Sequence, residues 1–223
     1  MKYKSVAIDG PAGAGKSTLA RQAAQKLGFL YVDTGAIYRT VALKVVRCGV
    51  DPEMPGDVAA LLPELNIRMD YDETGVQKMY LDQEDVSSAI REHHISGLAS
   101  KVSAVAQVRD FLLDFQRKQA LENNVVMDGR DIGTVVLPNA DVKIFLTAQP
   151  EARARRRQLE LEQRGETADF QTILRDIIQR DEQDKNRPIA PLRQAEDAVL
   201  VDTTQLNLEE SLDALLSVIK ERI

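Results

Sequence analysis

Residues 10–17 carry the strongest chemical signal in this chain, with the sequence Gly-Pro-Ala-Gly-Ala-Gly-Lys-Ser. They fit the pattern G-x-x-x-x-G-K-[ST], in which backbone N–H groups and the start of a following helix surround a phosphate. Lys16 adds a positive charge near the β- and γ-phosphates, and the Ser17 hydroxyl is a ligand for Mg²⁺. We therefore expect a nucleoside triphosphate site with Lys16 as a catalytic residue. The residues expected to bind the nucleotide are Gly10, Pro11, Ala12, Gly13, Ala14, Gly15, Lys16, Ser17 and Thr18.

The remaining sequence narrows the class of nucleotide-binding protein. A dinucleotide-binding fingerprint is excluded, because residues 13–18 lack its third glycine. A GTPase needs an Asn-Lys-x-Asp motif to read guanine, and no Asn in this chain is followed by Lys. A kinase, an ATPase motor and a nucleotide-gated switch remain.

Polar side chains follow two further apolar runs. Thr34 and Arg39 come after the run 29–32, and Asp128, Arg130 and Asp131 come after the run 125–127. Ligands bind at the carboxyl ends of strands in a parallel α/β sheet, so we expect these side chains near the phosphate loop. Asp128 is placed to orient Mg²⁺ through water, and Arg130 and Asp131 to face a second substrate. The alternatives are a helix cap at Thr34 with Arg39 in solvent, and a turn with an internal ion pair at residues 128–131.

Arginines concentrate in the last third of the chain. Nine of the 18 arginines fall between residues 151 and 193, at positions 153, 155, 156, 157, 164, 175, 180, 187 and 193, beside the single lysine Lys185. Arginine suits bidentate phosphate contacts. Arg153, Arg156 and Arg157 lie on neighbouring turns of one predicted helix. This pattern predicts a helical pair that closes over phosphates as a lid, or, alternatively, two solvated helices with internal ion pairs.

Short apolar runs alternate with helical patterns along most of the chain. Strands are predicted at residues 5–8, 29–32, 125–127, 142–146 and 198–201. Helices are predicted at about 19–27, 36–46, 108–115 and 208–219, the last with a capping box of Asn207 and Glu210. Five strands separated by helices predict an α/β fold with a parallel sheet covered on both faces.

Residues 51–91 interrupt this alternation. Three prolines are followed by short β-like pieces at 66–71 and 77–81, which predict an inserted subdomain with a small antiparallel element. We therefore expect a P-loop three-layer core of residues 1–50 and 92–223, a lid at about 150–190, and an insert at 51–91.

Composition excludes several classes of function. The 223 residues carry a net charge of −6, and aromatic residues make up 4% with no tryptophan. An acidic chain poor in aromatic side chains is not expected to bind nucleic acid or an anionic membrane. One cysteine and two histidines exclude an internal disulfide and a cysteine-rich or multi-histidine metal site. The N-terminal apolar run is too short for a signal peptide, and no run approaches the roughly 18 residues that span a bilayer. We expect a cytoplasmic protein, most simply a monomer.

With these motifs in place, the chain resembles the bacterial cytidylate kinases, within the P-loop nucleoside monophosphate kinases. The resemblance extends over nearly the full length, and the long 51–91 segment matches the enlarged monophosphate-binding insert of this family. The matching segments are residues 7–18, 33–39, 128–133, 142–146 and 180–187.

The resemblance implies a reaction of pyrimidine metabolism, the transfer of a phosphoryl group from ATP to CMP or dCMP with Mg²⁺. Position by position, it implies that Arg39, Arg130 and Arg187 hold the acceptor phosphate, that Ser100, Arg109 and Asp131 read cytosine, and that Arg180 and Asp184 hold the ribose. Thr34 stands where the family often has serine, which keeps the hydroxyl. The expected catalytic residues are Lys16, Asp128 and the lid arginines Arg153 and Arg157; Arg155 stays outside the set, because that position can be histidine.

Two other functions remain open at this point. One is a kinase of a different small acceptor, such as UMP, AMP or shikimate. The other is a nucleotide-gated switch whose arginine-rich lid binds a protein partner. Acceptor-dependent release of ADP distinguishes both from a CMP kinase.

Overall fold

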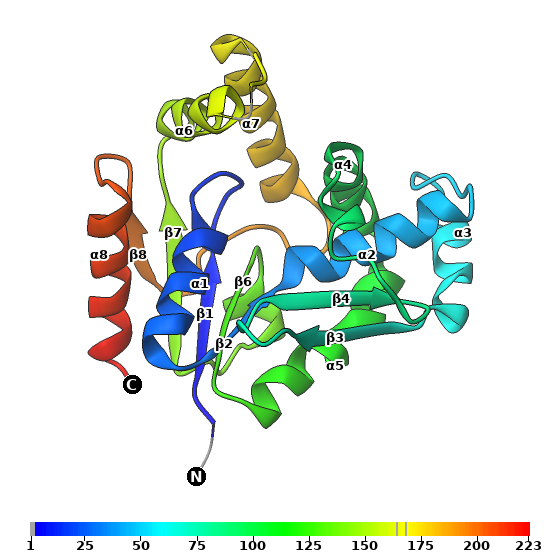
Figure 1. Ribbon diagram of the computed structural model, residues 1–223, viewed down its shortest axis with the longest axis horizontal. Helices are drawn as coiled ribbons and strands as arrows, with labels where there is room; N and C mark the ends of the chain where they lie inside the picture. Colours follow the sequence, from blue (N-terminus) through cyan, green and yellow to red (C-terminus); the bar gives the residue numbers. More distant parts are fainter. Residues whose placement is uncertain (1–2, 164, 168) are drawn as a thin grey trace.

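A five-stranded parallel sheet forms the centre of the computed structural model, which describes residues 3–163, 165–167 and 169–223 (Figure 1). The strand order is β2-β6-β1-β7-β8, and every neighbouring pair is parallel. The strands are β1 (Ser5–Asp9), β2 (Leu30–Asp33), β6 (Val125–Gly129), β7 (Val142–Thr147) and β8 (Val199–Asp202). The predicted α/β class and the five predicted strands are confirmed, with ends that shift by one or two residues.

Helices cover both faces of this sheet. Val6 and Ile8 of β1 pack with the helices on one face, and Ala7 between them packs with the helices on the other face. This alternation follows from the two-residue period of a strand and explains the continuous apolar runs in the sequence. The first face carries α1 (Lys16–Leu27) and α8 (Leu208–Lys220); the second carries α2 (Thr34–Arg47), α4 (His93–Val102) and α5 (Ala106–Glu122).

Local sequence signals set the ends of the helices. Gly28 ends α1 in the left-handed conformation, with a φ of 68°. Asn207 and Glu210 form the predicted capping box of α8. Helix α2 is capped by Asp33, whose side chain accepts from the N–H of Ala36 at 2.9 Å. The alternative of a cap at Thr34 is therefore wrong, because Thr34 is already the first helical residue.

Residues 51–91 contain the predicted antiparallel element and share a hydrophobic core with α2. The hairpin pairs Met69 with Met79, and Met79 packs in one cluster with Ile37 and Val41 of α2. The division into a core and an insert of residues 51–91 stays a prediction. The elements of the segment are α3 (Pro55–Ala60), η1 (Leu62–Glu64), β3 (Ile67–Tyr71), β4 (Gln77–Leu81), β5 (Glu84–Asp85) and η2 (Ala89–Arg91).

Two helices stand over the carboxyl ends of the strands, where the lid was predicted (Figure 1). They are α6 (Pro150–Gln163) and α7 (Phe170–Asn186), and they pack against each other. Of the arginines predicted for this region, Arg164 lies outside the described residues. A short π-helical turn, η3 (Ile132–Val136), follows β6. Within the described ranges, none of the helices has the length and apolar character needed to cross a membrane.

Candidate active site

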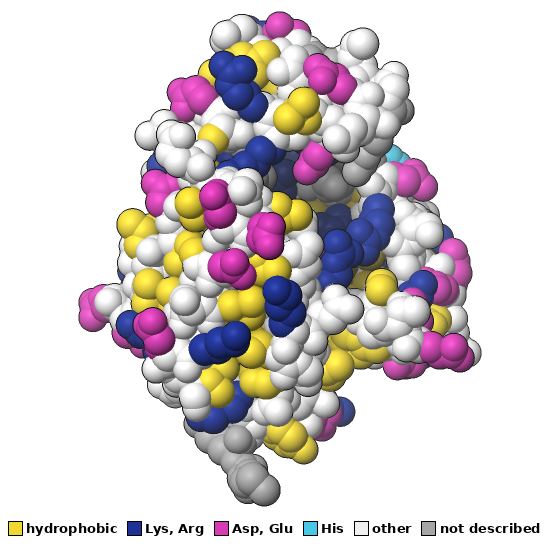
Figure 2. Space-filling view, turned by 60° about the vertical axis from the view of Figure 1, so that its left-hand side comes forward, with side chains coloured by type: hydrophobic (Ala, Val, Ile, Leu, Met, Phe, Trp, Pro, Cys, Tyr) yellow, Lys and Arg dark blue, Asp and Glu magenta, His cyan; other side chains and the backbone are white. Residues whose placement is uncertain are grey.

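One cavity of about 740 Å³ opens at the carboxyl edge of the sheet, below α6 and α7. The phosphate loop lines one end, and α2, α4 and the end of β6 line the other. In Figure 2 lysine and arginine side chains gather in the hollow under the upper part of the molecule. A cavity of this size, lined by many lysine and arginine side chains, suits phosphorylated ligands.

The phosphate loop is built by glycine conformations that other residues rarely adopt. Gly13 and Gly15 have φ values of 72° and 87°, and α1 begins directly after them. At Gly10 a Cβ atom would lie 1.9 Å from the carbonyl oxygen of Leu146, so only glycine allows the loop to pass β7. The N-terminus of α1 therefore points into the cavity, as anion binding requires.

Lys16 is 5% exposed, and its Nζ donates to the carbonyl oxygen of Pro11 at 2.7 Å. Burial and, next to it, the positive charge of Arg130 lower the pKa of Lys16 to about 7. An anion between these two cations would favour the charged form of the lysine. The ammonium group is thus held ready for a phosphate.

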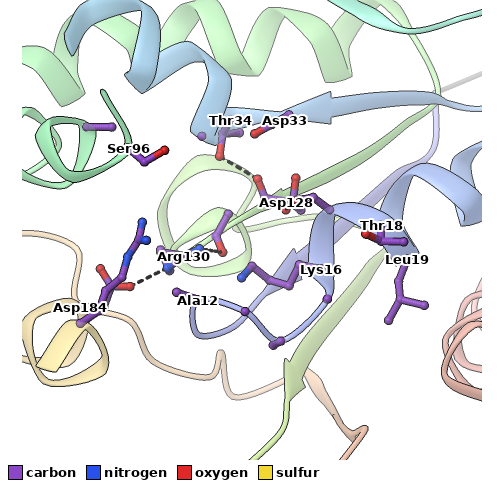
Figure 3. A pocket seen from close by; sticks show the side chains of 18 of the residues that line it. Ala12, Lys16, Thr18, Leu19, Asp33, Thr34, Ser96, Asp128, Arg130 and Asp184 are labelled. Atoms are coloured by element: carbon purple, nitrogen blue, oxygen red, sulfur yellow. Dashed lines mark hydrogen bonds and ion pairs between the residues drawn. The ribbon is translucent and has the colours of Figure 1, made fainter. Parts of the chain in front are cut away.

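Asp128 joins the phosphate loop to the strands beside it (Figure 3). Its Oδ2 accepts from the Ser17 hydroxyl at 2.9 Å, and its Oδ1 accepts from the Tyr31 hydroxyl at 2.9 Å. Its backbone carbonyl accepts from the Thr34 hydroxyl at 2.7 Å. Burial and, next to it, the negative charge of Asp33 raise the pKa of Asp128 to about 6. A cation beside Asp128 would offset both the burial and the repulsion by Asp33, and so would favour the ionised carboxylate.

The side-chain oxygens of Ser17 and Asp128 fit a Mg²⁺ ion that would be held partly by the protein and partly by the substrate. Ser17 and Asp128 supply oxygen ligands, which Mg²⁺ prefers, and Mg²⁺ sites commonly combine one or two protein oxygens with substrate phosphates and water. Among the described residues there is no group of three or more His, Cys, Asp or Glu side chains that could hold a metal without substrate.

Arginines and carboxylates alternate on the acceptor side of the cavity. Arg39 pairs with Asp33 at 2.9 Å, and Arg130 pairs with Asp184 at 2.7 Å. These pairs bring together residues up to 54 positions apart in the sequence. The alternation holds several guanidinium groups close to one another without an anion, because each carboxylate offsets the repulsion.

Asp131 receives two arginines at once. Arg109 donates to one carboxylate oxygen, and Arg187 donates to the other at 3.2 Å. Arg180 lines the cavity nearby, and its Nε is buried without a hydrogen-bond partner in the part of the chain that the structure describes. Burial and the charge of Arg130 lower the pKa of Arg180. Arg180 is therefore an available donor for a ligand.

Most residues predicted for the site line this one cavity. Gly10 and Pro11 form the entrance of the phosphate loop and do not line it. The lining set contains Ala12, Gly13, Ala14, Gly15, Lys16, Ser17, Thr18, Thr34, Arg39, Ser100, Arg109, Asp128, Arg130, Asp131, Arg180, Asp184 and Arg187.

The two lid arginines predicted to be catalytic do not line the cavity. Arg153 is buried, donates to the carbonyl oxygen of Ala12 at 2.9 Å, and pairs with Asp181 at 2.5 Å. Arg157 has a side chain that is 37% exposed and pairs with Glu160 at 3.2 Å. Each guanidinium pairs with a nearby carboxylate, and the catalytic role of both arginines stays a prediction. The arginine of α6 that lines the cavity is Arg156, which donates to Thr203.

Sequence reasoning missed several lining residues. Asp33 and Tyr38 lie in the segment that was singled out, but only Thr34 and Arg39 were assigned there. Ser96 and Ser103 line the cavity from α4 and its C-terminal end, beside Ser100, which was predicted. Their spacing of four and three residues puts them on one helical face, and that pattern was a usable signal.

Comparison with known proteins identifies the family of this chain. The family model described as cytidylate kinase matches residues 6–221. The chain belongs to the cytidylate kinase family. A cytidylate kinase from Carboxydothermus hydrogenoformans is 49% identical over 214 residues, which is 96% of each chain. A cytidylate kinase from Halalkalibacterium halodurans is 45% identical over 223 residues, the full length of both.

A solved structure supports the fold independently of close sequence similarity. An uncharacterised protein from Eubacterium ventriosum is 14% identical to this cytidylate kinase family member and has a TM-score of 0.53, with 99% of this chain and 100% of that chain covered. The predicted family and the P-loop α/β fold are thus confirmed.

Proposed function

We propose that this protein transfers the γ-phosphoryl group of ATP to CMP or dCMP and releases ADP with CDP or dCDP. Membership of the cytidylate kinase family supports this reaction. The structural observation that carries it is the single cavity that joins the phosphate loop to the cluster of Arg39, Arg130 and Arg187. A donor phosphate at one end and an acceptor phosphate at the other would meet inside it.

The donor side supplies charge and orientation. Backbone N–H groups of the loop and the N-terminus of α1 bind the phosphates of ATP, and Lys16 stabilises negative charge on the transferred group. Ser17 and, by way of water, Asp128 would hold Mg²⁺, which would supply positive charge against the negative charge of the phosphates. The 2.9 Å contact between these two side chains supports a shared site.

The acceptor side holds the monophosphate in line with the donor. Arg39, Arg130 and Arg187 would exchange part of their contact with carboxylates for contact with the phosphate. No side chain needs to act as a general base, because the attacking phosphate oxygen is already an anion at neutral pH. Catalysis is then mainly positioning and charge stabilisation.

The base and the sugar are read further from the phosphate loop. Ser100, Arg109 and Asp131 contact cytosine in this proposal, and Arg180 and Asp184 contact the ribose. The unpartnered Nε of Arg180 supports its role. The two carboxylate oxygens of Asp131 face two arginines, so the base contact requires a shift in that pairing.

The site is complete within one chain, which supports a monomeric enzyme. We also propose that the enzyme acts in the cytoplasm, where the ATP and the pyrimidine monophosphates that it would use are available. Arg153 and Arg157 would reach the transferred phosphate only after α6 moves relative to the phosphate loop.

The experiment is a panel of acceptors. ADP release is measured with CMP, dCMP, UMP, AMP and shikimate in turn, each with and without Mg²⁺. We expect fast release with CMP and dCMP that depends on Mg²⁺. If release is fastest with another acceptor, the protein is a kinase of that acceptor. If ATP is hydrolysed slowly whichever acceptor is present, the protein is a nucleotide-gated switch.

A further inference from the structure

Asp9 is a buried carboxylate for which the proposed reaction has no use. It is the last residue of β1, directly before Gly10, and it is 4% exposed. Its Oδ1 accepts from the backbone N–H of Ile132 at 2.7 Å, and its Oδ2 accepts from the N–H of Gly133 at 2.7 Å. Both oxygens are therefore used by backbone donors 123 and 124 residues away in the sequence.

Ile132 and Gly133, which provide these two N–H groups, lie at the end of the segment that carries the proposed acceptor-binding side chains. Residues 128–133, called the acceptor loop below, run from the end of β6 into η3 and include Arg130 and Asp131. Strand β1 lies beside β6 in the sheet, with Asp9 opposite Gly129. Asp9 thus connects the start of the phosphate loop to the far end of the acceptor loop.

The fit around this contact is close. A Cβ atom on Gly133 would lie 3.3 Å from Oδ2 of Asp9 and 3.2 Å from Cδ of Lys143. Thr34 holds the other end of the acceptor loop through its hydrogen bond to the carbonyl oxygen of Asp128. The loop is consequently fixed at both ends. Asp128 contacts Ser17 of the phosphate loop at the first end, and Asp9, directly before Gly10, holds the second end.

We propose that Asp9 is a positioning residue that holds the acceptor loop in register with the phosphate loop, and so sets acceptor binding and transfer without touching either substrate. This inference rests on the proposed function of the site. Burial raises the pKa of Asp9 to about 6, although the two N–H donors oppose the shift, so the carboxylate is ionised at pH 7.5. Both oxygens then accept, as the geometry requires.

The test is Asp9→Asn, which preserves the size of the side chain. The amide offers one acceptor oxygen, and its NH₂ group must face the second backbone N–H, donor against donor. We expect the KM for CMP to rise about tenfold or more and kcat to fall, while the KM for ATP changes less than threefold. Hydrogen exchange of the amides of residues 129–136 should become faster.

Asp141→Asn is the matched control. Asp141 accepts from the N–H of Ser5 at 2.9 Å and from the Ser5 hydroxyl at 3.1 Å, at the opposite end of β1. This control should leave both KM values and the exchange of residues 129–136 within twofold of the wild type. Gly133→Ala serves as a second variant if Asp9→Asn does not fold, because the new methyl group presses on the same contact. It should give the same selective loss of CMP binding.

Each outcome is decisive. Equal losses of CMP and ATP affinity, or unchanged exchange in the acceptor loop, would overturn the positioning role. A wild-type enzyme without CMP-dependent transfer would instead contradict the proposed function, and the exchange measurement would still test the connection between the two loops.

Discussion

Paired arginines and aspartates are the chemical feature that defines the site at the scale of residues. Asp33, Asp131 and Asp184 each hold one or two arginines inside the cavity. Arg39 and Arg130 are partly exposed and face the space where a phosphate would lie. Because carboxylates hold the arginines in place, the site should lose less side-chain entropy when the acceptor binds.

Lys16→Ala should remove most of the activity and leave the fold intact. Loss of one such group from a transition state typically lowers the rate about 10²–10³-fold, or about 3–4 kcal/mol. The measurement is kcat for CMP at saturating ATP, with circular dichroism to check folding. Lys26→Ala, in the last turn of the same helix, is the control and should be fully active. Near-normal turnover by Lys16→Ala would refute the assignment of the phosphate loop.

Asp131→Asn should narrow the preference for CMP over UMP. An ionised carboxylate accepts from the cytosine amino group but opposes the carbonyl that uracil presents at the same position. Each good base contact gives about 1–3 kcal/mol of discrimination, so kcat/KM for CMP should fall roughly 10- to 100-fold and that for UMP much less.

Asparagine is chosen at this position because truncation to alanine would leave Arg109 and Arg187 facing each other. Asp114→Asn, on the exposed side of α5, is the control. Equal proportional losses for CMP and UMP would mean that Asp131 holds the charge balance of the site and does not read the base.

Helices α6 and α7 are the elements whose arrangement we expect to change during catalysis. Arg153 ties α6 to α7 through Asp181 and to the phosphate loop through Ala12. Arg156 and Arg180 line the cavity from the two helices. Anions in the cavity would draw these cations inward and exclude water from the reacting groups.

Hydrogen exchange should therefore slow across residues 150–186 when ATP and CMP bind together. Either nucleotide alone should protect these helices less, because only both together neutralise the cations of the two helices. The hairpin of β3 and β4, which does not line the cavity, is the internal control. Unchanged exchange in α6 and α7 would indicate a static helical pair.

The sequence predicted the elements better than the side-chain pairs between them. Short continuous apolar runs located the strands, and helical spacing before Gly28 located α1, because these signals are local. The partner of Arg153 is Asp181, 28 residues away on another helix, and no local pattern indicates that pairing. Arg157 was expected to contact a phosphate, but in the structure it pairs with Glu160, three residues away. The sequence shows both possible partners of Arg157 and does not decide between them.

At the scale of the whole molecule, one hydrophobic cluster links the sheet, α2 and the segment 51–91. Val32, Ile37 and Met79 all belong to it and are almost completely buried. Composition and prolines indicated the segment, but they could not show that its hairpin completes the core of α2. Thr34 and Arg39, which we propose bind the acceptor, are thus carried by a helix that the segment 51–91 helps to pack.

The free energy of unfolding should depend on pH because of Asp9, which is buried at the end of β1. A pKa raised from 3.8 to about 6 contributes stability that is present below pH 4 and lost as the pH rises through 6. Asp9→Asn lacks this titration. The free energy of unfolding of the wild type minus that of Asp9→Asn should therefore decrease by roughly 2–3 kcal/mol between pH 4 and pH 7.

Urea denaturation at several pH values measures this difference, and Asp141→Asn provides a control of opposite sign. Burial acts to raise the pKa of Asp141, but hydrogen bonds from Ser5 and Lys4 hold it below its usual value. Its contribution is present above pH 4 and lost as the pH falls, so the same difference should increase with pH. Parallel profiles for wild type and Asp9→Asn would mean that Asp9 ionises as it does in the unfolded chain.

Direct transfer between two nucleotides in one cavity is the central claim, and the fate of labelled phosphate tests it most directly. The enzyme is incubated with CMP, Mg²⁺ and ATP that carries radioactive phosphorus in the γ-position. We predict that the label appears in CDP in the same amount as the ADP formed. Label that appears as inorganic phosphate, at a rate that does not depend on CMP, would contradict the account.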